Sequence, residues 1–107
     1  MMETLNYALV FTNSKGKKAL CKNNGTECSI EDKPFYVSKK NAEKGAKNIL
    51  KSLKRNFDRI TYWYERAKTD DSLHKLEKER YINEYKNALI IMDKGLDIVE
   101  VKISIEI

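Results

Sequence analysis

The stretch 38–68 constrains the fold of this chain most, because it keeps one helical period throughout. Ser38 can cap a helix, and the stretch contains no proline and a single glycine, Gly45. Its apolar or small residues recur at steps of three and four; they are Ala42, Ala46, Ile49, Leu53, Phe57, Ile60, Tyr64 and Ala67. This spacing predicts one continuous helix of about 30 residues, roughly 45 Å long, with one buried side.

A different face of the same stretch is strongly basic. It holds 10 Lys and Arg residues against Glu43, Asp58 and Glu65, a net charge of +7 in a chain whose total is +5. So concentrated a positive field suggests a polyanionic partner: a nucleic acid, a nucleotide or an acidic protein surface. We therefore predict a binding surface that consists of Lys44, Lys51, Arg55, Arg59, Tyr62, Trp63 and Arg66.

Three successive aromatic residues, at positions 62–64, lie within this surface. On a helix they span about 200° of the circumference, so they cannot all face one core. Tyr64 belongs to the apolar stripe, which leaves Tyr62 and Trp63 two alternatives. They either pack elsewhere in the domain or serve as interface anchors, a role in which Tyr, Trp and Arg are enriched.

Strand patterns flank the helical part of the chain. Residues 7–12 predict a strand with apolar residues on both faces, central in its sheet. The turn at 13–16 contains Gly16, and residues 17–22 would return as a second strand. A weaker strand is predicted around 27–30. From Leu96 onward the period becomes strand-like, with Val99 and Val101 on the apolar side and Glu100 and Lys102 on the polar side.

A second amphipathic helix is expected over 70–94, capped within the Asp70–Ser72 segment and ended by Gly95. Its predicted stripe comprises Leu73, Leu76, Ile82, Tyr85, Leu89 and Met92. The chain should thus be one α+β domain, 1–107, with an antiparallel sheet of three or four strands against a long helical hairpin. The expected order is β-β-(β)-α-α-β, with a β-hairpin region at 1–37, a long basic helix at 38–68 and a C-terminal strand at 97–107.

Catalytic and metal-binding patterns are weak. Glu100-Val101-Lys102 matches half of a divalent-metal nuclease pattern, but no helix follows and no Pro-Asp pair precedes it, so the nuclease is a minor alternative. His74 with Cys21 and Cys28 lacks the spacing of a zinc site. We expect no enzymatic activity, no cofactor and no metal. With no membrane-spanning run, no signal peptide and only two cysteines, a cytoplasmic setting is expected.

In general composition, rich in Lys, Asn, Ile and Glu and poor in Pro, the chain resembles small accessory proteins of phages and other mobile elements of AT-rich bacteria. That resemblance implies a role in blocking or diverting host machinery. We expect a non-enzymatic inhibitor of a bacterial defence complex, similar to an anti-CRISPR protein, in the cytoplasm of a bacterial host. The alternatives are an oligomeric sponge for a nucleotide immune signal and a non-specific nucleic-acid binder. Self-association through the helices is also expected.

Overall fold

The computed structural model describes the backbone of residues 2–105 and the side chains of residues 5–102. In chain order the elements are β1 (Met2–Thr12), β2 (Lys18–Cys21), β3 (Glu27–Cys28), a 3₁₀ turn (Ile30–Asp32), β4 (Phe35–Tyr36), α1 (Lys39–Arg55), α2 (Phe57–Thr69), α3 (Lys75–Lys94) and β5 (Asp97–Ile105). The predicted α+β class with an antiparallel sheet is confirmed. The described sheet has five strands rather than three or four, because the short apolar run after Pro34 pairs as β4.

β1 is the central strand of the sheet. Along one edge it pairs antiparallel with β2, where Val10 faces Leu20, and with β4, where Tyr7 faces Tyr36. Along the other edge it pairs with β5 over residues 2–10. Its apolar residues point to both faces, and two neighbours, Ala8 and Leu9, are fully buried. A strand covered on both faces is the reason for this double apolar pattern.

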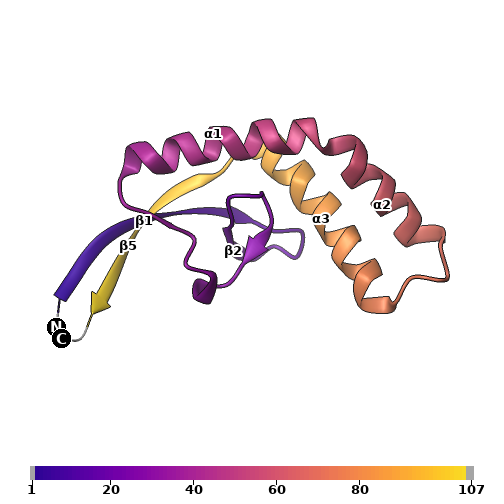
Figure 1. Ribbon diagram of the computed structural model, residues 1–107, viewed down its shortest axis with the longest axis horizontal. Coiled ribbons are helices and arrows are strands. Elements are labelled where there is room, and N and C mark those ends of the chain that lie inside the picture. Colours follow the sequence, from indigo (N-terminus) through magenta and orange to yellow (C-terminus); the bar gives the residue numbers. More distant parts are fainter. Residues whose placement is uncertain (1, 106–107) are drawn as a thin grey trace.

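The helices form a second layer (Figure 1). α1 lies across the sheet, and α2 and α3 run antiparallel to each other beyond one end of the sheet. The α1 residues Ile49 and Leu53 join Leu9 and Phe11 of β1 in one hydrophobic cluster. The apolar stripe predicted over 42–67 is therefore the buried side of the helical layer.

The prediction of one continuous helix over 38–68 was wrong. The helix is interrupted at Asn56, whose backbone adopts φ −97° and ψ 7°, and α2 leaves at an angle to α1. The Asn56 side chain donates from Nδ2 to Ser52 Oγ at 3.3 Å, and this local side-chain bonding is one reason why asparagine is a poor helix-interior residue. The bend lets α2 leave the sheet and pack against α3.

The second helix also begins later than predicted, at Lys75 instead of residue 70. Its N-cap is His74, whose Nδ1 accepts a hydrogen bond from the backbone N–H of Leu76 at 3.2 Å. The predicted apolar stripe holds in part: Tyr85 and Met92 pack against the core, whereas Leu76 and Leu89 are 68% and 41% exposed and the buried residues are Ala88 and Ile91. The predicted stop at Gly95, which has φ 77°, is confirmed.

β1 and β5 continue past the helical layer as a two-stranded ribbon, at the end opposite to the α2–α3 hairpin (Figure 1). The expected burial of the β5 face that carries Val99 and Val101 does not hold among the described side chains, because Ile98, on the opposite face, is the β5 residue that packs on the core. Leu96 and Ile98 pack against the core, whereas Val99 is 37% exposed. Residues 106–107 of the predicted strand lie outside the described residues.

Replacing Ile49 with alanine should lower the free energy of unfolding by about 2–5 kcal/mol, because the side chain is 1% exposed and its loss leaves a cavity in the shared cluster. Urea denaturation followed by circular dichroism measures the change. Val37→Ala is the control: Val37 is 77% exposed, so its truncation should change stability by less than about 0.5 kcal/mol. Equal effects of the two substitutions would contradict this core.

Candidate functional site

The outer face of α1 is strongly basic. Its seven basic residues, all exposed, are Lys39, Lys40, Lys44, Lys47, Lys51, Lys54 and Arg55. Glu43 is the one acidic residue of this helix. Lys47 and Lys51 lie two residues before and after the buried Ile49, which places each about 160° from it around the helix axis. Burying the stripe on the sheet thus turns the basic residues, named here the α1 cationic face, toward solvent.

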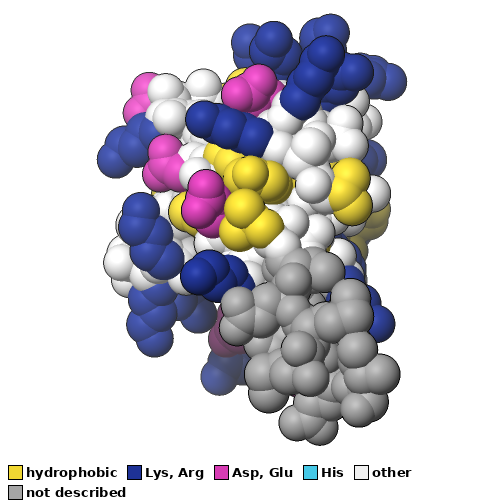
Figure 2. All heavy atoms as spheres, turned by 90° about the vertical axis from the view of Figure 1, so that its left-hand side faces the viewer, with side chains coloured by type: hydrophobic (Ala, Val, Ile, Leu, Met, Phe, Trp, Pro, Cys, Tyr) yellow, Lys and Arg dark blue, Asp and Glu magenta, His cyan; other side chains and the backbone are white. Residues whose placement is uncertain are grey.

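These cations have no charged partner among the described side chains. Within the described side chains, none of the seven makes an ion pair or a side-chain hydrogen bond. Figure 2, which views the molecule from the ribbon end, shows Lys and Arg side chains gathered along the top edge, where α1 lies in Figure 1. Repulsion between neighbouring cations is therefore not relieved by carboxylates of the described chain.

α2 differs sharply from α1 in this respect. Arg59 pairs with Glu84 of α3 at 3.7 Å, and Lys68 pairs with Glu65 at 3.3 Å. Arg66 forms an ion pair with Asp70 and donates from Nη1 to the Tyr62 hydroxyl at 3.1 Å. Every basic residue of α2 is thus occupied by an acidic side chain of the same protein.

The predicted basic row is therefore divided at Asn56. Lys44, Lys51 and Arg55 lie on the α1 cationic face, whereas Arg59 and Arg66 lie on α2 with carboxylate partners. The sequence predicted both groups on one straight helix, but the structure places them on two helices that meet at an angle.

The aromatic cluster mainly joins α2 to α3. Trp63 stacks on Tyr81 with ring centroids 5.1 Å apart, and Tyr64 stacks on Tyr85 at 3.9 Å. Tyr62 is 53% exposed and meets Trp63 edge-on. Of the two alternatives left open for Tyr62 and Trp63, the structure shows Trp63 packed inside the helical hairpin, so Tyr62 is the aromatic residue that still offers a large exposed area.

The α1 cationic face is larger than the predicted surface. Lys40, Lys47 and Lys54 were counted in the charge but were absent from the predicted surface. Their position relative to the stripe is a usable signal, since all three lie at least about 140° from Ile49 at 100° per residue. These lysines can therefore be predicted from the sequence as the residues on the side of the helix opposite to the apolar stripe.

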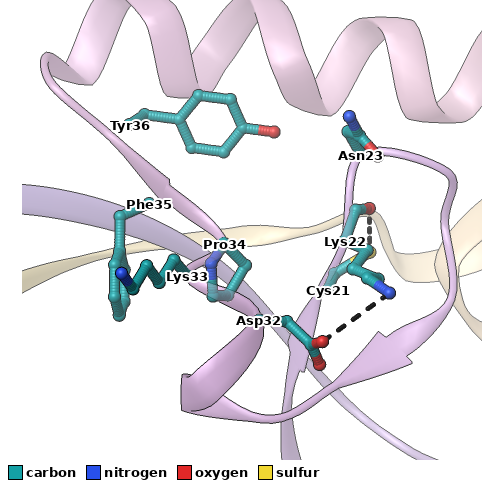
Figure 3. Close-up of a pocket in the computed structure, with 8 residues that line it drawn as sticks. All are labelled: Cys21, Lys22, Asn23, Asp32, Lys33, Pro34, Phe35 and Tyr36. Atoms are coloured by element: carbon teal, nitrogen blue, oxygen red, sulfur yellow. Dashed lines mark hydrogen bonds and ion pairs between the residues drawn. The ribbon is translucent and has the colours of Figure 1, made fainter.

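A pocket of about 320 Å³ opens beneath α1, between the end of β2 and β4 (Figure 3). The Tyr36 hydroxyl points toward Asn23 across it, and at its rim Lys22 pairs with Asp32 at 3.8 Å. Burial, with a smaller contribution from Cys21, raises the pKa of Tyr36. The pocket therefore presents a neutral phenol and an amide, while one of its cations is already neutralised.

Tyr36 also explains why a glycine occupies the middle of α1. A Cβ at Gly45 would lie 2.6 Å from the Tyr36 hydroxyl oxygen, closer than van der Waals contact allows. Gly45 thus lets α1 pack directly on the ring of Tyr36, which is one of the residues that line the pocket.

The candidate chemical groups of the sequence fall on separate parts of the fold, with Cys21 and Cys28 on the paired strands β2 and β3, and His74 and the Glu100–Lys102 pair on other elements. Burial raises the pKa of the Cys21 thiol to about 12, so it stays protonated at neutral pH and is a poor nucleophile. Glu100 and Lys102 are exposed on β5, and His74 caps α3. The described residues contain no cluster of three His, Cys, Asp or Glu side chains suited to a metal ion. None of the helices within residues 2–105 has the length and apolar character needed to cross a membrane.

Asp70→Asn should lose stability in a pH-dependent way. Hydrogen bonds from Ser72 and Arg66 hold the pKa of the Asp70 carboxyl well below its usual range, which stabilises the fold wherever the unfolded carboxyl would also be ionised. The difference in free energy of unfolding between the wild type and Asp70→Asn is therefore largest near neutral pH and shrinks as the pH falls below about 4.

Urea denaturation across this pH range measures that difference. Asp71→Asn is the matched control, because Asp71 is fully exposed and its contact with Lys78 Nζ is long, at 3.9 Å. That variant should follow the wild type at every pH. A gap for Asp70→Asn that stays constant down to strongly acidic pH would refute the assigned role of the carboxylate.

Comparison with known proteins finds no family model, no curated protein and no solved structure that matches this chain.

Proposed function

We propose that this chain is a non-enzymatic binding protein that docks on the phosphate backbone of nucleic acid through the α1 cationic face. One observation carries the proposal: all seven cations of α1 are exposed and without ion pairs among the described side chains, while those of α2 are all paired. Cations that neutralise phosphates release condensed counterions, which is the main source of sequence-independent affinity.

The geometry of α1 suits an extended polyanion. Successive residues such as Lys44, Lys47 and Lys51 are three or four positions apart, which is about 5 Å along the helix axis. Phosphates on one strand of duplex DNA advance by about 3.4 Å of axis each, so a row of cations can meet a row of phosphates without one-to-one registry. Binding should therefore depend on backbone charge and little on base sequence.

The inhibitor of a bacterial defence complex stays a prediction that rests on general composition. Under that prediction, the α1 cationic face would contact nucleic acid held by the complex, in the cytoplasm of a bacterial host. The nucleotide sponge has less support. Its clamping side chains would include Arg59 and Arg66, which already form ion pairs with carboxylates of the same chain.

Reversing two charges in the middle of the face should abolish most of the affinity. We expect Lys47→Glu/Lys51→Glu to weaken binding to a random-sequence duplex by at least about tenfold near physiological salt, and to flatten the dependence of log Kd on log salt. Fluorescence anisotropy at several salt concentrations measures both quantities.

Lys75→Glu/Lys86→Glu is the matched control for this experiment. It makes the same change in net charge at two exposed residues of α3 that have no ion pair in the described structure. Its affinity should fall far less than that of the α1 variant. Wild-type protein that does not bind duplex or single-stranded nucleic acid at low salt would refute the proposed function.

Arg55→Glu and Arg59→Glu should have opposite consequences, although the two residues are four positions apart. Arg55 is exposed and unpaired, so its reversal should weaken nucleic-acid binding several-fold and leave stability nearly unchanged. Arg59→Glu places a second carboxylate beside Glu84, which is only 23% exposed. This substitution should therefore lower stability and affect binding less. Anisotropy and urea denaturation of both variants test the division of the surface at Asn56.

A further inference from the structure

β5 is an open edge of the sheet. It pairs with β1 from Asp97 opposite Val10 to Ile105 opposite Met2, and no other described strand pairs with it. Its second row of backbone N–H and C=O groups is therefore unpaired within the described sheet over nine residues. Such a row is a template for another strand.

The exposed side chains of β5 do not protect this edge by repulsion. Glu100 and Lys102 point to the same side of the strand, because side chains alternate with a period of two. Both are exposed, and neither makes an ion pair with another described side chain. One negative and one positive charge lie on either side of Val101. In a second copy of the strand that runs antiparallel to the first, the order of the two charges is reversed, so opposite charges can face each other.

The symmetry of a dimer selects one register for this pattern. When two copies of β5 pair antiparallel about a two-fold axis, the axis must pass beside one residue of each strand. An axis at Glu100 or at Lys102 sets like charges directly opposite each other. An axis at Val101 sets Glu100 opposite Lys102 of the second copy, and Lys102 opposite its Glu100.

The described extent of β5 fits the same register. An axis at Val101 pairs all nine described positions, Asp97–Ile105, with their counterparts in the second copy. We propose that β5 is a self-association edge, where a second copy of this chain pairs antiparallel about Val101 with two reciprocal Glu100–Lys102 ion pairs. The proposal is independent of the nucleic-acid function.

This dimer would also arrange its helices in a defined way. A two-fold axis perpendicular to the sheet keeps the same sheet face of both copies on one side. Since α1 packs with Leu9 and Phe11 on one face of β1, both α1 helices would lie on that side of a joined ten-stranded sheet. The two cationic faces would then belong to one surface.

Sedimentation velocity of the full chain, without nucleic acid, tests the proposal. We expect a dimer whose population rises with protein concentration. Lys102→Glu and Glu100→Lys should each weaken it by roughly tenfold, because each turns two attractive cross-strand pairs into two repulsive ones. The double exchange Glu100→Lys/Lys102→Glu should return the dissociation constant to near the wild-type value, and Lys86→Glu should leave it unchanged.

Hydrogen exchange of the wild-type protein provides a readout that needs no variant. Outward-facing amides within 97–105 should gain protection as the protein concentration rises through the dimerisation range. A monomer at all concentrations, a dimer unaffected by the single reversals, or a double exchange as weak as the single variants would each overturn the proposal. Circular dichroism confirms that every variant compared is folded.

Discussion

The packing of α1 on the central strand is the interaction on which the rest of the structure depends. Ile49 and Leu53 share one hydrophobic cluster with β1, so the opposite side of α1 must face water. Solvation explains why that side is polar, but it does not explain why nearly all its charges have one sign. Like charges three or four residues apart on a helix, as in Lys47 and Lys51, destabilise it by about 0.2–0.5 kcal/mol per pair. The uniform sign of the α1 cationic face is thus a cost to folding that binding to a polyanion would offset.

The bend at Asn56 separates two uses of charge. Before the bend, the cations form no ion pair with a described carboxylate. After it, Arg59 and Arg66 hold Glu84 and Asp70, and together with the Trp63–Tyr81 stack they join α2 to α3 and the loop between them. The same residue types therefore stay unpaired in one helix, where the proposed function assigns them to binding, and stabilise the helical hairpin in the next.

The sequence was sufficient for the fold class and for the buried side of 42–67, because both follow from the period of apolar residues. It was insufficient for the bend, since the period continues through Asn56. The phase of α3 depends on a tertiary contact: Asn87 is buried because its side-chain oxygen accepts a hydrogen bond from the Ser14 backbone N–H at 3.0 Å. Likewise, which cations are free depends on carboxylates such as Glu84, which belong to elements distant in sequence.

Self-association through the helices, the arrangement expected from their length, meets an electrostatic obstacle in this structure. A second α1 laid on the first would oppose two surfaces of net +6 each, and Trp63 and Tyr64 of α2 are already stacked on α3. The β5 edge avoids this obstacle, because its own charges alternate in sign. A dimer formed there would still hold two cationic faces on one side of the sheet, where a bound polyanion would reduce their mutual repulsion. Binding and dimerisation would then strengthen each other, as thermodynamic linkage requires when one process relieves a cost of the other.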